Sequence, residues 1–168
     1  VDFAHTPDSF EKLFKDLRPV VKGKLIVLFG SAGRRDEAKR AVQGKLAGEY
    51  ADEVVVTEED DRDCDGQEIL EMIAGGAEAA GKVRDKNLFL VHDRPEAIAF
   101  ALSRATSADD TVLLLGKGHE KTIERNGPRA AELRHLKQDD SNTERVRTDP
   151  WDEIATTKDA LQELLKAK

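Results

Sequence analysis

Residues Thr111–Glu120, which read TVLLLGKGHE, form the segment that decides the fold. Four aliphatic residues, Val112–Leu115, run directly into a Gly-Lys-Gly turn that presents a lysine, a histidine and a glutamate. A continuous aliphatic run that ends at a glycine turn is typical of a strand buried on both faces of a parallel sheet. Open α/β sheets bind ligands beyond the carboxyl ends of their strands. We therefore expect a site at Gly116–Glu120.

The same alternation of short aliphatic runs and longer amphipathic segments extends in both directions from this strand. Further strands are predicted at 25–29, 54–57 and 88–91. Helices are predicted at the apolar stripes that span 10–17, 38–50, 69–77 and 98–105. Thr6, Asp65 and Asp93 are expected as helix N-caps, and Pro7 suits a first helical position. This order predicts an α/β, Rossmann-like domain with a mostly parallel sheet of about five or six strands and helices on both faces.

The second and last helices carry more specific expectations. The buried stripe of the second helix is predicted to be Ala38, Ala41, Val42, Leu46 and Tyr50. Residues 125–148 are polar and are expected to be an irregular, partly mobile excursion, with one helical segment near 130–137. Asp149 and Pro150 are predicted to open a final helix over 149–166. The whole of 1–168 is expected to be one domain.

Composition limits the classes of function. The chain has 168 residues, a net charge of −7 and no dense block of Lys and Arg, which argues against nucleic-acid binding. No apolar run has the length of a transmembrane helix, and no secretory signal is visible at the amino terminus. Cys64 is the single cysteine, so an internal disulfide is excluded. These features predict a cytoplasmic protein.

Two motifs together carry a family resemblance: VDFAHTPDS at Val1–Ser9 and LLLGKGHE at Leu113–Glu120. They resemble the carboxyl-terminal domain of the Mur ligases, and most closely that of the ligases that add the third residue of the peptidoglycan stem peptide. The resemblance covers residues 1 to about 120 and the last helix. It implies that ATP activates the carboxylate of a UDP-N-acetylmuramoyl-dipeptide as an acyl phosphate, which the amine of an incoming amino acid then attacks.

The resemblance also assigns roles in amino-acid binding. Arg35 matches the family's carboxylate clamp, and Gly116 and Glu120 match the groups that hold an ammonium end, with Lys117 and His119 as possible support. The family's amino-acid recognition motif, usually Asp-Asn-Pro-Arg, reads here Glu59, Asp60, Asp61 and Arg62. Its Asn and Pro are lost, as are the family Asp at Arg34 and the family Pro at Ala41. The added acids suit an amino acid with a side-chain amine, and diaminopimelate and lysine both fit.

Nucleotide binding is expected to lie mainly outside this chain. Asp2 and His5 resemble residues that face the nucleotide, and residues 1–6 are expected to be the remnant of a junction with a central domain that binds ATP and Mg²⁺. Gly76–Val83 imitates a phosphate-binding loop but has Val83 where a hydroxyl is needed. Gly81 is instead expected to end a helix. No catalytic residue is expected in this fragment alone.

Several motifs also have structural interpretations. Gly30–Gly33 is either an anion-binding turn or a tight strand-to-helix turn. The acidic run after residue 57 is either a specificity loop or a solvated loop, and its Asp61-x-Asp63-x-Asp65 spacing imitates a calcium loop. Met72 stands where that loop needs a glutamate, so no metal site is expected. His92 is expected to be structural and His135 exposed.

Two other functions stay open. One is a different Mur ligase or a folylpolyglutamate-type ligase, whose motifs differ at DFAHTPDS. The other is a free-standing amino-acid or calcium-binding module without a reaction of its own. A phosphate loop upstream of Val1 would favour a ligase.

Overall fold

A four-stranded parallel sheet organises the molecule, which the computed structural model describes over residues 1–135 and 144–167. The strands are β1 (Leu25–Phe29), β2 (Glu53–Val56), β3 (Leu88–Leu90) and β4 (Thr111–Leu114), in the order β3-β2-β1-β4. β1 is central, and its Val27 pairs with Val54 on one side and Leu113 on the other. The order of the strands therefore reverses between β1 and β4, and α/β sheets open a crevice at such a switch point.

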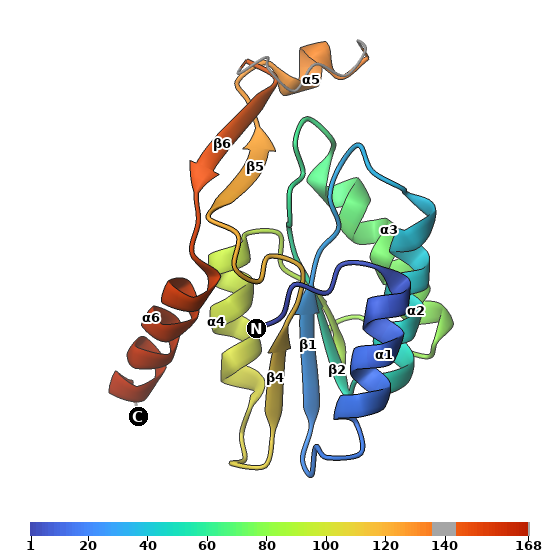
Figure 1. Cartoon of the computed structure of the whole chain (residues 1–168), viewed down its shortest axis with the longest axis vertical. Helices are drawn as coiled ribbons and strands as arrows, with labels where there is room; N and C mark the ends of the chain where they lie inside the picture. The colour runs from blue at the N-terminus through green and yellow to red at the C-terminus, as the bar shows by residue number, and fades with distance from the viewer. Residues whose placement is uncertain (136–143, 168) are drawn as a thin grey trace.

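Helices cover both faces of this sheet (Figure 1). α1 (Pro7–Leu17), α2 (Ala38–Tyr50) and α3 (Gly66–Ala79) lie on one face, and α4 (Arg94–Arg104) and α6 (Glu153–Lys166) on the other. All five residues of β1 are fully buried, because alternate side chains enter the two cores. The α/β, mostly parallel fold predicted from the sequence is confirmed. In the part of the chain described, no helix combines the length and apolar character needed to cross a bilayer.

The predicted helix termini agree with the structure. The Thr6 side chain accepts a hydrogen bond from the amide of Ser9 and begins α1 in a capping box, with Pro7 in the first turn. The side chains of Asp65 and Asp93 accept hydrogen bonds from backbone amides in the first turns of α3 and α4. Gly81 has φ 90° directly after the C-cap of α3, the left-handed conformation that glycine adopts most easily.

The expectation of five or six strands in the parallel sheet is wrong. Within the described residues that sheet has four strands, and β5 (Thr122–Asn126) and β6 (Val146–Pro150) form a separate antiparallel ribbon. The ribbon stands above the carboxyl edge of the sheet, with the short helix α5 (Ala130–Leu133) at its far end (Figure 1). Each of its strands carries one aliphatic residue, Ile123 or Val146, so hydrophobic periodicity did not reveal it.

The ribbon also corrects the irregular excursion predicted for 125–148. The predicted helical segment is present at α5, and residues 136–143 lie outside the described part of the chain. The final helix begins at Glu153 rather than at 149, with Asp152 as its N-cap. Asp149 and Pro150 instead pair with Ile123 and Thr122 in the ribbon. The Asp-Pro pair imitated a helix start, but backbone pairing with β5 holds it in an extended conformation.

The stripe predicted for α2 is also wrong. Its buried residues are Arg40, Gln43, Gly44, Ala47 and Gly48. The predicted Val42 is 47% exposed, and Leu46 and Tyr50 are only partly buried. A Cβ atom on Gly44 would lie 1.9 Å from the carbonyl oxygen of Ile73 in α3. The small residues of α2 face α3 because the two helices cross too closely for larger side chains.

Candidate functional site

A cavity of about 760 Å³ opens at the carboxyl ends of β1, β2 and β4. The predicted site residues that line it are His5, Arg35, Glu59, Asp60, Arg62, Gly116 and Glu120. Asp2, Asp61, Lys117 and His119 do not line it. The cavity thus gathers side chains from the amino terminus and from the loops that follow three strands, at the switch point of the sheet.

The Gly30–Gly33 turn is shaped by close packing against the loop after β2. A Cβ atom on Gly30 would lie 2.4 Å from the carbonyl oxygen of Thr57, and one on Gly33 would lie 2.2 Å from that of Asp61. The amide of Gly33 donates to the carbonyl of Asp60 at 2.8 Å. These contacts explain both glycines as a tight turn that lets two loops touch.

The two arginines after this turn have different surroundings. Arg34, at φ 56°, forms a bidentate pair with Asp63, with both nitrogen–oxygen distances at 2.9 Å. Arg35 is exposed, lines the cavity, and makes no side-chain hydrogen bond or ion pair with any described residue. Its guanidinium is therefore available for an anion from solution, and this planar fork suits a carboxylate.

The acidic run after β2 is mostly buried, so the solvated-loop interpretation is wrong. Glu58 and Asp63 are 3% and 1% exposed. Glu58 pairs with Arg125 of the ribbon at 2.5 Å, and Asp63 pairs with both Arg34 and Arg145. Burial alone would raise the pKa of Asp63, but hydrogen bonds from these two arginines hold that pKa below its ordinary value. These pairs bind the ribbon to the loop.

Asp60 and Glu120 share one cation inside the cavity wall. The Lys117 ammonium group lies 2.9 Å from Asp60 and 2.8 Å from Glu120, and its side chain is 1% exposed. Gly116 and Gly118, with φ 101° and 50°, turn the backbone so that Lys117 points inward. Lys117 therefore fixes the positions of two carboxylates that line the cavity, although it does not line the cavity itself.

Arg62 lines the cavity and is bound from the ribbon side. Its Nε lies 2.7 Å from Glu124 and its Nη1 donates to the carbonyl of Gly33 at 3.0 Å. Its backbone, at φ 55°, also donates to the carbonyl of Glu124. Only 12% of its side chain is exposed. The guanidinium therefore already has a carboxylate partner.

Glu59 is the remaining carboxylate of the recognition motif. It lines the cavity, is 7% exposed, and makes no side-chain hydrogen bond or ion pair with a described residue. A Cβ atom on Gly116 would lie 2.5 Å from its Oε2, so the carboxylate lies directly against that glycine. Burial raises the pKa of Glu59 above its ordinary value.

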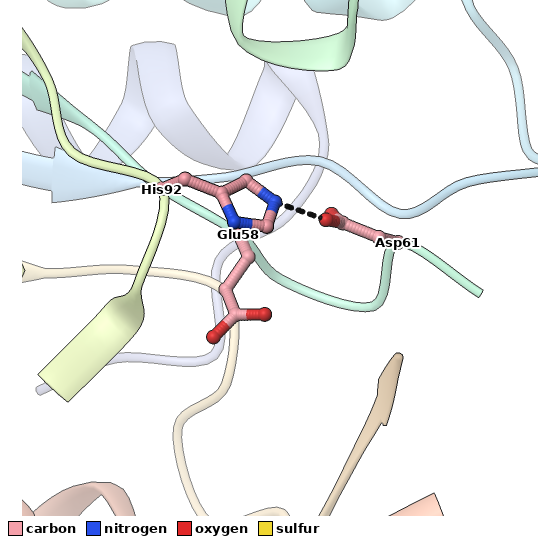
Figure 2. A group of neighbouring side chains, drawn as sticks. All are labelled: Glu58, Asp61 and His92. Carbon is pink, nitrogen blue, oxygen red and sulfur yellow. Dashed lines mark hydrogen bonds and ion pairs between the residues drawn. The ribbon is translucent and has the colours of Figure 1, made fainter. Parts of the chain in front are cut away.

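Asp61 faces away from the cavity. Its Oδ2 lies 2.5 Å from Nε2 of His92, as Figure 2 shows, and Asp61 and His92 with Glu58 form a group whose ligand atoms lie within 4.8 Å of one another. Such a group could hold a metal ion, but the Glu58 carboxylate is already bound by Arg125. The hydrogen bond to Asp61 raises the pKa of His92. We assign the pair a structural role, as predicted for His92.

The three carboxylates with calcium-loop spacing have other partners in the structure. Asp61 binds His92, Asp63 binds Arg34 and Arg145, and Asp65 caps α3. The three carboxylates therefore turn to three different partners.

The amino terminus lies along the other side of the cavity. The amide of Asp2 donates to the carbonyl of Leu114 at 2.8 Å and extends the sheet beyond β4. The carbonyl of His5 accepts hydrogen bonds from Lys39 and Gln43 of α2. The ring of exposed His119 packs on Phe3 at 5.2 Å between centroids. His135 is exposed, as predicted.

A buried ion pair behind the site was not predicted from the sequence. Arg94, fully buried at the start of α4, binds Glu153 of α6 with two bonds of 3.0 and 2.7 Å. It also donates to the carbonyls of Glu58 and Leu115. An Asp-Arg-Pro helix start looks like an exposed cap, and only the packing of α6 buries the guanidinium.

Comparison with known proteins agrees with this geometry. The family model described as Mur ligase, glutamate ligase domain, matches residues 1–118. The chain is 45% identical over 164 residues to a UDP-N-acetylmuramyl-tripeptide synthetase from Roseiflexus sp. (strain RS-1), which covers 98% of this chain. It is 44% identical over 120 residues, or 71% of this chain, to a UDP-N-acetylmuramoyl-L-alanyl-D-glutamate–2,6-diaminopimelate ligase from Synechococcus elongatus.

A solved structure agrees as well. A UDP-N-acetylmuramoyl-L-alanyl-D-glutamate–2,6-diaminopimelate ligase superposes with a TM-score of 0.74 at 26% identity, over 96% of this chain. The chain spans 28% of the length of that structure and of the Roseiflexus relative, and 23% of the Synechococcus relative. The likeness therefore covers about a quarter of each of these proteins.

Proposed function

Because this chain belongs to the Mur ligase family through its glutamate ligase domain, we propose that it is the amino-acid-binding domain of an ATP-dependent ligase. The complete enzyme joins an amino acid to a UDP-N-acetylmuramoyl-dipeptide in the cytoplasm, and its substrate is diaminopimelate or lysine. One observation carries the proposal. A cavity at the switch point holds the carboxylates of Glu59 and Glu120 together with Arg35, whose side chain has no partner among the described residues. An α-amino acid with a side-chain amine supplies both complementary charges.

The nucleotide chemistry belongs to other parts of the enzyme. Gly76 lies in α3 and Gly81 follows its C-cap, so the segment that imitates a phosphate loop closes a helix instead of opening one. ATP with Mg²⁺ would phosphorylate the dipeptide carboxylate elsewhere. In this proposal Asp2 and His5 face the nucleotide; His5 lines the cavity, and the backbone of Asp2 pairs with Leu114.

This domain contributes positioning. Arg35 binds the α-carboxylate of the amino acid, and the carboxylates near Gly116 bind its side-chain amine. Closure of the domain then brings the α-amine to the acyl phosphate and excludes water. The amine attacks the carbonyl carbon, the tetrahedral intermediate collapses, and phosphate leaves.

Substitution of the cavity charges tests the proposal in the complete ligase. Arg35→Ala and Glu120→Ala should each raise the amino-acid KM by ~10²-fold, the scale of a lost charge-assisted contact. Phosphate release at varied amino-acid concentration gives this value. Arg84→Ala is the control, because Arg84 does not line the cavity and pairs at the surface with Glu71 and Glu78. An unchanged KM in both cavity variants would contradict the assignment.

A further inference from the structure

The cavity carries more negative than positive charge at its Gly116 end. Glu59, Asp60 and Glu120 all lie there, and Lys117 is the cation that binds two of them. Glu59 has no cation of its own among the described residues. Arg94, Lys39 and Lys117 act on the charge of Glu59 without binding its carboxylate, and the ammonium hydrogens of a ligand would supply the donors that it lacks among the described residues.

The one arginine that the resemblance assigns to a distal carboxylate is already neutralised. Arg62 is bound by Glu124 through its Nε and through its own backbone amide. A second carboxylate on the ligand would have to compete with Glu124, and it would enter beside the carboxylates around Lys117. Repulsion between this second carboxylate and the buried carboxylates of the cavity would oppose binding.

We propose, on the basis of the proposed function, that Glu59 binds the side-chain ammonium group of the incoming amino acid, and that this substrate is a diamino acid with a single carboxylate. Lysine and its shorter homologues belong to this class, and diaminopimelate, with its second carboxylate, does not. Arg35 binds the one carboxylate at the other side of the cavity. Arg62 and Glu124 form the wall that excludes a second carboxylate.

The shape of the Gly116 turn supports this role for Glu59. The carboxylate rests against the Cα of Gly116, where any side chain would displace it. The turn thus places Glu59 at the cavity surface while the rest of its side chain is buried. Burial raises the pKa of Glu59, and an ammonium partner would lower that pKa. Binding of the diamino acid should therefore strengthen as the pH rises through the pKa of Glu59 in the free enzyme.

The test uses the complete ligase and a set of amino acids. Phosphate release and product mass are measured with L-lysine, L-ornithine, meso-diaminopimelate and L-norleucine, which keeps the lysine chain but lacks its charge. We expect kcat/KM for lysine or ornithine to exceed that for diaminopimelate by at least about tenfold. Norleucine should be poorer than lysine by ~10²-fold, as for a lost charged contact.

Two variants separate the contributions of Glu59 and of the Arg62–Glu124 pair. Glu59→Gln should lower kcat/KM for the preferred diamino acid by ~10²-fold and so reduce the advantage of that substrate over norleucine. Glu124→Gln removes the negative charge that lies 2.7 Å from Nε of Arg62, and it should raise the ratio of diaminopimelate to lysine use by about tenfold. Glu68→Gln, on the exposed side of α3, is the matched control and should change neither ratio. Thermal melting of each variant checks its fold.

The outcomes distinguish this inference from the function on which it rests. Equal or better use of diaminopimelate by the wild type would overturn the inference and leave the ligase function standing. Unchanged lysine kinetics in well-folded Glu59→Gln would also overturn it. Absence of amide formation with every amino acid would overturn the proposed function and this inference together.

Discussion

Lys117 shows how a single buried side chain arranges the cavity. Its ammonium group bridges Asp60 and Glu120 at 2.9 and 2.8 Å and is almost completely withdrawn from water. A buried ammonium group is tolerated only when it is well paired, so Lys117 and its two carboxylates restrain one another. Glu59, one residue before Asp60, lacks such a partner among the described residues. Asp60 and Glu59 therefore differ: Lys117 already binds the carboxylate of Asp60, whereas the carboxylate of Glu59 can bind a cationic group of a ligand.

The pair of Asp61 and His92 predicts a pH dependence of stability. The hydrogen bond to Asp61 raises the folded-state pKa of His92, so protonated His92 is favoured by folding. This stabilisation is fully present below the unfolded pKa, near 6.5, and is lost as the pH rises through the folded pKa. The Tm difference between the wild type and His92→Asn should therefore be largest near pH 5.5 and shrink by pH 9. A difference that is constant over this range would contradict the prediction.

At the scale of helices and strands, contact between α2 and α3 depends on glycine. A Cβ atom on Gly44 would meet the carbonyl of Ile73, and one on Gly76 would meet the carbonyl of Ala41, each at 1.9 Å. The crossing therefore places backbone against backbone. Close approach of this kind also fixes the start of α2, from which Lys39 and Gln43 hold the amino-terminal segment.

Two glycines on these helices should respond oppositely to alanine. Gly44→Ala should destabilise the fold by about 1–3 kcal/mol, because the added methyl group forces the helices apart. Gly75→Ala is the matched control, since a Cβ atom there meets nothing within 4 Å. It should stabilise α3 by about 0.5–1 kcal/mol through helix propensity. Urea unfolding gives both values, and destabilisation of equal size at the two positions would refute this account of the crossing.

The ion pair between Arg94 and Glu153 connects α4 with α6. Arg94→Met should cost about 3–5 kcal/mol, because Glu153 would be left charged and fully buried. Arg84→Met is the control: its ion pairs are about 40% exposed, and its loss should cost less than about 1 kcal/mol. The free energy of unfolding of each variant measures the difference. A cost below that of the control would show that the buried pair contributes little.

At the scale of the whole molecule, charge pairs join the ribbon to the sheet domain. Arg125 binds Glu58, Arg62 binds Glu124, and Arg145 binds Asp63. Each pair connects the ribbon region to the loop that follows β2. These pairs therefore hold the ribbon above the carboxyl edge of the sheet (Figure 1).

The division of labour within the proposed ligase gives a prediction for the chain as a whole. Purified residues 1–168 should neither hydrolyse ATP nor form an amide bond, because the described residues contain no phosphate-binding loop. Phosphate release with ATP, Mg²⁺ and lysine present is the measurement, and the complete ligase is the positive control. ATP turnover by this chain above background would overturn the proposed division.

The sequence by itself determined the elements whose signals are local. The strands at Leu25–Phe29 and Thr111–Leu114, the caps at Thr6, Asp65 and Asp93, and the gathering of motifs at one sheet edge all follow from aliphatic runs and capping residues. A buried strand is marked by its own run of aliphatic residues, and a helix end by a capping residue beside it. Both signals lie within a few neighbouring residues, so they can be recognised in the sequence.

Only the tertiary structure decided the face of α2, the ribbon and the partner of each charged side chain. The ribbon is held by backbone hydrogen bonds, which leave no periodic signature in TIERN or VRTDP. Arg94 binds Glu153, which lies 59 positions away in the sequence, and Arg62 binds Glu124, which lies 62 positions away. The state of a charge depends on its burial and on the opposite charge that packing brings to it. The sequence therefore placed Glu59 and Arg62 in one motif, and the fold left Glu59 facing the cavity while it bound Arg62 to Glu124.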